Sequence, residues 1–330
     1  MSGVIRIFGR LRDWSHTAAG RRTGQFISIA LSGLIILLLV RAIQRIGWTN
    51  LITVLPDAPL AVLAFWLCFA GQYLIQPVAD WMIFRRWWKL RFADLAIFLR
   101  KHARNETLFA YAGEGWLLAW AARRQGLEFD PDNPPSIAGR GTGPGTPPGE
   151  NPFADVKDVA ITSGLAGNLF PLVMLLLAIA MGAASALGGS IEPSLLRQAG
   201  IGFSVLVVLN IVILFNRGRL FTLPFVANVR SFAWHFGRVS VGHALLVGSW
   251  IAALPLVGVE AWVLLGALRL VVARLPLPNK QLLFATTAAA LVGEAAPAVA
   301  ALMAAQGVLT LAGHALSWLA AGAIDARRAA

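Results

Sequence analysis

Two glutamates lie in an apolar stretch of the chain, Asn105–Ala122, with the sequence NETLFAYAGEGWLLAWAA. An ionisable group at membrane depth is costly and by default indicates a functional site. On a continuous helix, Glu106 and Glu114 would lie about 80° apart around the axis and would line one side of a cavity. Asn105 and Tyr111 lie beside them, so these four side chains are candidate substrate-binding residues. The alternative is that Glu106 only pairs with a nearby arginine.

A third glutamate, Glu294, lies in the apolar sequence AALVGEAAPAVAAL, near the middle of a helix predicted at 281–303. Pro297 follows three residues later and lacks a backbone donor, so it weakens the helix locally and can open a polar site there. Glu294 is therefore also a candidate substrate-binding residue. The alternative is a protonated glutamate that is hydrogen-bonded inside a helical bundle.

Further polar side chains fall in the predicted cytoplasmic halves of helices, namely Asn168, Asn210, His243 and Arg269. With the segment 105–114 they are predicted to form a polar vestibule that opens to the cytoplasm. The guanidinium of Arg269 can pair with a carboxylate or receive a lipid phosphate. Taken singly, each of these residues is more often a helix–helix hydrogen bond or a snorkelling side chain. His314 and Ser317 are expected to be contacts within the bundle.

The chain lacks the short motifs of the common catalytic and metal sites. It contains no P-loop, no H-E-x-x-H, no G-x-S-x-G and no cysteine–histidine metal spacing, and Cys68 is its single cysteine. We therefore expect no metal and no cofactor. An enzyme is expected only if its catalytic residues are dispersed along the chain.

The composition is typical of an integral membrane protein. Of the 330 residues, 57% are hydrophobic and 13% are charged, against roughly 25% charged residues in soluble domains. The net charge of +12 gathers beside the apolar runs, where basic residues set topology and contact anionic headgroups. Membrane lipids are therefore the expected partners, and nucleic acid is not.

The apolar runs predict an all-α fold, a polytopic transmembrane helical bundle in one integral membrane domain over residues 1–330. The predicted helices cover about 25–43, 60–79, 161–187, 195–215, 239–256, 259–272, 281–303 and 306–324. These helices give about eight crossings with both termini cytoplasmic, because every basic loop then lies on that side. The segment 105–122 is too short to span and has basic flanks, which predicts a re-entrant or interfacial segment. Pro77 is expected to kink or end the second helix.

Residues 125–158 are rich in Gly, Pro and Asp and lack apolar periodicity. This composition predicts a flexible cytoplasmic loop, through which a protein partner could bind. The high Ala, Gly and Arg content is typical of a GC-rich bacterial genome, so we expect the inner membrane of a bacterium.

A basic aromatic stretch after the second helix, DWMIFRRWWKLRF, precedes the segment that carries Asn105, Glu106, Tyr111, Gly113 and Glu114. In this layout the chain resembles the flippase-like membrane domain of the lysylphosphatidylglycerol synthase family. The resemblance implies that the chain binds or translocates a lipid or a lipid-linked substrate. Two alternatives stay open. One is a membrane-embedded enzyme of lipid or cell-envelope polysaccharide biosynthesis, with Glu106 or Glu114 as general base. The other is a non-catalytic membrane assembly partner.

Overall fold

A computed structural model of the chain describes residues 48–107, 112–124, 145–181, 207–274 and 291–329, with a few isolated residues between them. All regular structure in these residues is helical, and they contain no strand. The helices are α3 (Trp48–Thr53), α4 (Pro59–Trp87), α5 (Leu95–Thr107), α6 (Ala112–Arg124), α7 (Pro152–Ala180), α10 (Arg217–Leu220), α11 (Phe225–Ala253), α12 (Val259–Arg274) and α14 (Ala296–Ala329), with short 3₁₀ turns η1 (Phe92–Asp94) and η3 (Gly293–Ala295).

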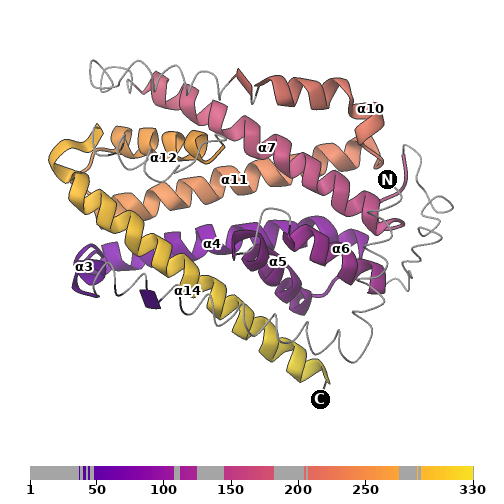
Figure 1. Cartoon of the computed structure of the whole chain (residues 1–330), viewed down its shortest axis with the longest axis horizontal. Helices are drawn as coiled ribbons and strands as arrows, with labels where there is room; N and C mark the ends of the chain where they lie inside the picture. The colour runs from indigo at the N-terminus through magenta and orange to yellow at the C-terminus, as the bar shows by residue number, and fades with distance from the viewer. Residues whose placement is uncertain are drawn as a thin grey trace.

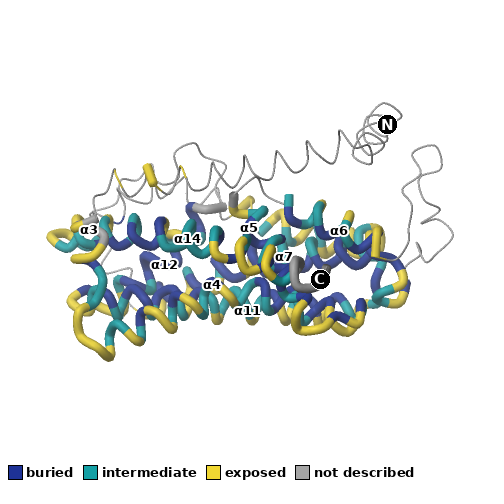
Figure 2. Tube along the Cα trace, turned by 90° about the horizontal axis from the view of Figure 1, so that it is seen from below, coloured by how far each residue is buried: buried dark blue, intermediate teal, exposed yellow. Residues whose placement is uncertain are grey.

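Three helices of 29 residues each, α4, α7 and α11, run along the long axis of the molecule (Figure 1). Helix α11 packs against both α4 and α7, α12 packs on α7 and α11, and α14 crosses the bundle obliquely over α5. Helices α5 and α6 pair with each other beside the second half of α4. The edge-on view of Figure 2 shows a slab that is much longer than it is thick.

The core between α4, α11, α12 and α14 is built from large apolar side chains, among them Phe65, Trp250, Trp262 and Leu302, which are all buried. Large apolar side chains also cover the outside, such as Leu67 on α4 (63% exposed) and Leu319 on α14 (70% exposed). An apolar exterior is unfavourable in water and is typical of helices that face lipid.

Three segments among the described residues are long and apolar enough to cross a membrane: Pro59–Trp87, Pro152–Ala178 and Gly293–Ile324. They support the expectation of transmembrane helices in an all-α protein. The eight predicted crossings are not shown. The helix predicted at 25–43 lies almost wholly outside the described residues, as do parts of those predicted at 161–187, 195–215 and 281–303.

The last turns of α4 and α6 and the short helix α10 lie at one end of the molecule, on the right in Figure 1. These segments carry basic residues, namely Arg85, Arg86, Arg123, Arg124, Arg217 and Arg219. We call this the basic end. The opposite end carries α3 and the turn between α11 and α12 (Figure 1).

Helix α4 does not end near Pro77, as the sequence led us to expect, but continues to Trp87. Beyond the proline, Ile83 and Phe84 are buried in a second core with Phe98 of α5 and Leu117 of α6. This packing offsets the backbone hydrogen bond that the proline removes. Helix α11 likewise starts 14 residues before the predicted helix at 239–256, directly after Pro224.

The break predicted between helices 281–303 and 306–324 is wrong, because α14 continues through it. Gln306 is the polar residue at the expected break. Its side-chain oxygen accepts a hydrogen bond from Trp250 Nε1 of α11 at 2.8 Å. The amide oxygen is therefore satisfied inside the bundle, so Gln306 does not require a break in the helix.

The prediction of a flexible loop at 125–158 is wrong for the last part of that range. Residues 125–144 lie outside the described residues. Helix α7 starts at Pro152 rather than at residue 161. The Asn151 side chain caps it by accepting hydrogen bonds from the backbone of Phe153 (3.0 Å) and Ala154 (3.3 Å). Proline at the first helical position also favours a helix start.

Two buried acids in the first turns of α7 bind neighbouring segments. The Asp155 carboxylate accepts hydrogen bonds from Trp88 Nε1 (2.8 Å) and from the backbone of Gly149 (3.1 Å). The Asp158 carboxylate accepts from the backbone of Thr222 (2.9 Å) and Leu223 (2.7 Å) and from the Asn228 side chain (3.3 Å). These acids hold the basic end together, so they belong to the folded core and not to a solvated loop.

Replacing Asp158 with alanine is expected to lower the free energy of unfolding by at least about 2 kcal/mol, since several buried donors lose their acceptor. The measurement is the temperature at which the thiol of Cys68 becomes reactive in detergent solution. Asp57→Ala is the matched control, because Asp57 is exposed. Equal midpoints for both variants would show that the carboxylate is dispensable.

Candidate functional site

A buried lysine joins three helices at the basic end. The Lys101 ammonium of α5 lies 2.6 Å from the Asp80 carboxylate of α4 and 3.1 Å from the Glu114 carboxylate of α6. Asp80 and Lys101 are buried and Glu114 is mostly covered. Charges removed from water are tolerated only when paired, so these contacts fix how α5 and α6 sit against α4.

We call Asp80, Lys101 and Glu114 the ion cluster. Helix α11 extends it toward α7. The Nε of Arg238 donates to Nδ1 of His235 at 2.9 Å, and its Nη2 donates to Ser163 Oγ of α7 at 2.7 Å. Burial lowers the pKa of His235 to about 3, and the Arg238 charge adds to the effect. The imidazole is therefore neutral, and its 4.0 Å approach to Asp80 is not an ion pair.

The ion cluster is suited to holding helices rather than to chemistry. Burial acts to lower the pKa of Lys101, but the carboxylates of Asp80 and Glu114 outweigh it, and the net pKa lies above its usual value. A lysine that stays protonated is neither a nucleophile nor a general base. Glu114, predicted from the sequence to bind substrate, is occupied by this lysine.

Residues 105–122 do not form one helix. Helix α5 ends at Thr107 and α6 begins at Ala112, so the angular relation expected between Glu106 and Glu114 does not apply. Asn105 joins the two helices, since its side-chain oxygen accepts a hydrogen bond from the backbone of Gly113 at 2.7 Å. Glu106 is exposed near the end of α5. Tyr111 lies outside the described residues.

A second polar cluster links α4, α5 and α14. Hydrogen bonds join the Tyr73 hydroxyl of α4 to His314 Nδ1 (2.9 Å) and to Ser317 Oγ (2.9 Å) of α14. The ring of His102 on α5 lies 5.2 Å from that of Tyr73 and 5.3 Å from that of His314. His314 and Ser317 are thus contacts within the bundle, as the sequence predicts.

The predicted vestibule is assembled only in part. Glu106 and Arg269 attract each other across α5 and α12, and the Arg269 charge also acts on His243 of α11. The His243 ring packs edge-on against Phe170, 5.6 Å between ring centres. Asn168 is buried on α7. Asn210 lies apart from this group and lines a separate pocket.

The sequence predicts that Glu294 lies inside a helix, and this prediction is wrong. It lies in the 3₁₀ turn η3 that precedes α14, and it is exposed. Gly293 has φ of +52° there, a conformation that ends regular helix on that side. The start of α14 lies at the end of the molecule away from α5 and α6 (Figure 1), so Glu294 is remote from Asn105, Glu106 and Glu114.

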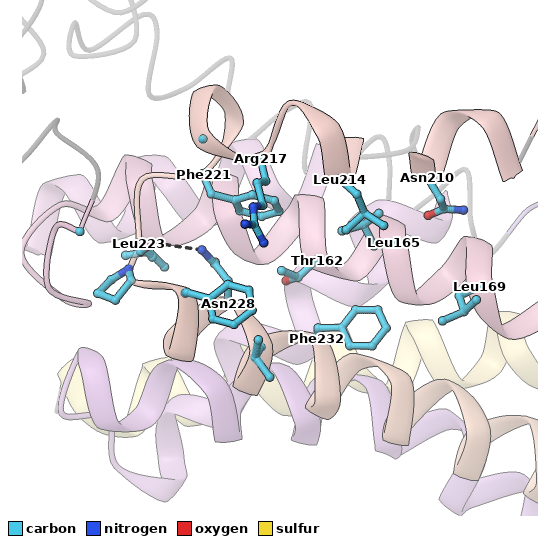
Figure 3. A pocket seen from close by; sticks show the side chains of 15 residues that line it. Thr162, Leu165, Leu169, Asn210, Leu214, Arg217, Phe221, Leu223, Asn228 and Phe232 are labelled. Atoms are coloured by element: carbon cyan, nitrogen blue, oxygen red, sulfur yellow. Dashed lines mark hydrogen bonds between the residues drawn. The ribbon is translucent and has the colours of Figure 1, made fainter. Parts of the chain in front are cut away.

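A pocket of about 880 Å³ opens between α7, the helical residues 207–215, α10 and α11. Figure 3 shows its side chains, with Leu165 and Leu169 of α7 facing Phe232 of α11. Arg217 reaches in from α10, and its guanidinium carbon lies 5.8 Å from the Phe225 ring centre. We call this space the lateral groove. Its apolar walls and Arg217, the one charged side chain among the described residues that line it, match an amphiphile with an anionic head.

Sequence reasoning missed both the ion cluster and the lateral groove. The helix predicted at 60–79 stops one residue before Asp80, which is the one acid within α4. His235 and Arg238 lie three residues apart, so they share a helix face, which is a usable signal. Lys101 was counted among flanking basic residues. The groove has no sequence signal, because its walls come from separate segments.

The fold and its apolar exterior define the class, an all-α protein with helices suited to a membrane. Within the described residues, no group of three or more His, Cys, Asp or Glu side chains could hold a metal ion. Comparison of the chain with protein-family models, curated proteins and solved structures finds no match.

Replacing Lys101 with methionine is expected to destabilise the fold by about 3–5 kcal/mol, because Asp80 is left buried and unpaired. The measurement is again the temperature at which Cys68 becomes reactive. Lys89→Met is the control, since Lys89 is exposed. The double variant Asp80→Leu/Lys101→Met should regain most of the loss. A single variant as stable as the control would refute the role of the ion cluster.

Replacing Gly113 with alanine is expected to force α5 and α6 apart. A Cβ atom there would overlap the carbonyl oxygen of Lys101 and lie 2.7 Å from Asn105 Oδ1. Gly115 is the matched control, since a Cβ atom there meets nothing within 4 Å. Proteolysis within residues 108–111 should accelerate in Gly113→Ala and not in Gly115→Ala. Similar cleavage rates would mean that the close approach is not required.

Proposed function

We propose that the chain is an integral membrane protein that binds, and moves between leaflets, a lipid or lipid-linked substrate with an anionic head. The observation that supports this proposal is the lateral groove. Its volume of about 880 Å³ is large enough for a drug-sized ligand or for part of a lipid. An apolar wall suits acyl chains, and the guanidinium of Arg217 suits a phosphate.

The location of the groove supports the same function. It lies beside α10, at the basic end. Basic residues concentrate on the cytoplasmic side of membrane proteins and attract anionic lipids there. We therefore place the basic end in the cytoplasm of a bacterium, with several crossings of the inner membrane and both chain termini on that side.

The wall of the groove is anchored rather than loose. Lys157 of α7 donates to the Leu220 backbone oxygen (2.6 Å) and to Thr222 Oγ1 (2.8 Å). With the Asp158 contacts, these bonds hold the turn after α10 against α7. A wall held in this way keeps the groove open for a substrate without the cost of ordering it on binding.

Filling the lateral groove is expected to abolish the proposed movement of lipid between leaflets. Leu214 lines it and is 57% exposed, so Leu214→Trp adds bulk there without disturbing the core. Leu316→Trp is the matched control, because Leu316 on α14 is 65% exposed and is not part of the groove. Cells that produce each variant are compared by outer-leaflet labelling and by mass spectrometry of total lipids.

The wild type and the control should shift one lipid between leaflets without changing its chemistry, and Leu214→Trp should not. A lipid species that disappears, or a precursor that accumulates, would favour the enzyme alternative instead. No difference between cells with and without the wild type would contradict the proposal.

A further inference from the structure

Besides Arg217 in the lateral groove, a second arginine, Arg104, lies against two tryptophan rings. The guanidinium carbon of Arg104 on α5 lies 4.2 Å from the ring centre of Trp116 on α6 and 4.9 Å from that of Trp318 on α14. Both distances are typical of cation–π contacts. Both indole faces cover part of the guanidinium, which limits the directions from which its N–H groups can be approached.

No carboxylate within the described part of the chain pairs with Arg104. Burial lowers its pKa to about 10, and the neighbouring charge of Arg100 adds to the effect. Arg104 stays charged at neutral pH, without a counter-ion from these residues. A partly buried cation with a like charge beside it is unfavourable unless an anion approaches it.

The hydrogen-bonding groups of this cluster are donors. Nη1 of Arg104 and Nε1 of Trp318 are both covered, and neither has an acceptor among the described residues. A buried donor without an acceptor costs roughly 1–3 kcal/mol. Donors and positive charge gathered in one place, with no acceptor, are suited to an oxyanion. Arg104 as a whole is partly exposed, so the site lies at the edge of the bundle rather than in its core.

The position of Trp318 along its membrane-spanning segment indicates which oxyanion would bind beside Arg104. Trp318 lies near the end of the candidate membrane-spanning segment Gly293–Ile324. Tryptophan is enriched at this level, where lipid headgroups meet the hydrocarbon core. The oxyanions most abundant at that depth are the phosphates of lipids.

The geometry points to a phosphate-binding site in which Arg104, held between Trp116 and Trp318, receives the headgroup of an anionic lipid at the membrane surface. This headgroup site shares no residue with the lateral groove. It does not depend on translocation, and it would anchor the α5–α6 pair and α14 to the same lipid.

The test is calorimetric titration of the full-length protein in an uncharged maltoside detergent. The titrants are dihexanoyl phosphatidylglycerol, inorganic phosphate, and dihexanoylglycerol, which has the chains without the phosphate. We expect saturable binding of the phospholipid alone. Arg104→Gln should weaken it by about tenfold or more, because a charge-assisted pair is lost.

Two further variants control the result. Arg124 stacks on Trp120 at 5.3 Å and lies 3.9 Å from Asp94, so it already has an acid partner, and Arg124→Gln should bind normally. Trp318→Phe keeps the aromatic face but removes the Nε1 donor, and it should weaken binding even if Arg104→Gln fails to fold. Unchanged affinity in Trp318→Phe and in a folded Arg104→Gln would overturn the site. Binding of inorganic phosphate with equal affinity would overturn its assignment to a lipid.

Discussion

A lysine ammonium buried between two carboxylates determines how one end of this protein is built. Asp80 lies on α4, a helix suited to a membrane, where an unpaired charge would cost several kcal/mol. Lys101 meets that charge from α5, and Glu114 meets Lys101 from α6. Because the lysine must sit this deeply, α5 and α6 must approach closely, and Gly113 has no room for a side chain.

The same end contains the other buried acids that hold separate segments together. Asp155 and Asp158 bind the Trp88 indole and the turn after α10, and Arg238 bridges α11 to α7. The lateral groove follows from this arrangement. The turn after α10 is held against α7 by polar bonds at the basic end, whereas Leu165 and Leu169 of α7 and Phe232 of α11 give the groove an apolar lining. A rigid polar end and an open apolar side suit the binding of an amphiphile.

Sequence patterns predicted the class of this protein because apolar length and charge spacing are local properties. The same patterns were misleading where a partner decides the outcome. They predict a kink or an end at Pro77 and a helix break before Gln306, but packing around Phe84 and a hydrogen bond from Trp250 accompany continuous helices at both places. Glu294 was expected inside a helix, but it lies in the turn before one. Each of these outcomes rests on contacts between residues far apart in the chain.

The sequence by itself determined that the chain is all-α, that its helices are apolar enough for a membrane, and that its basic residues lie beside them. These properties depend on composition and period alone. Only the tertiary structure decided which charges are paired. It assigned Glu114 to Lys101, left Arg104 between two tryptophans, and opened a groove beside Arg217. The physical reason is that the cost of a buried charge depends on what lies next to it in space, and spacing along the chain does not give that information.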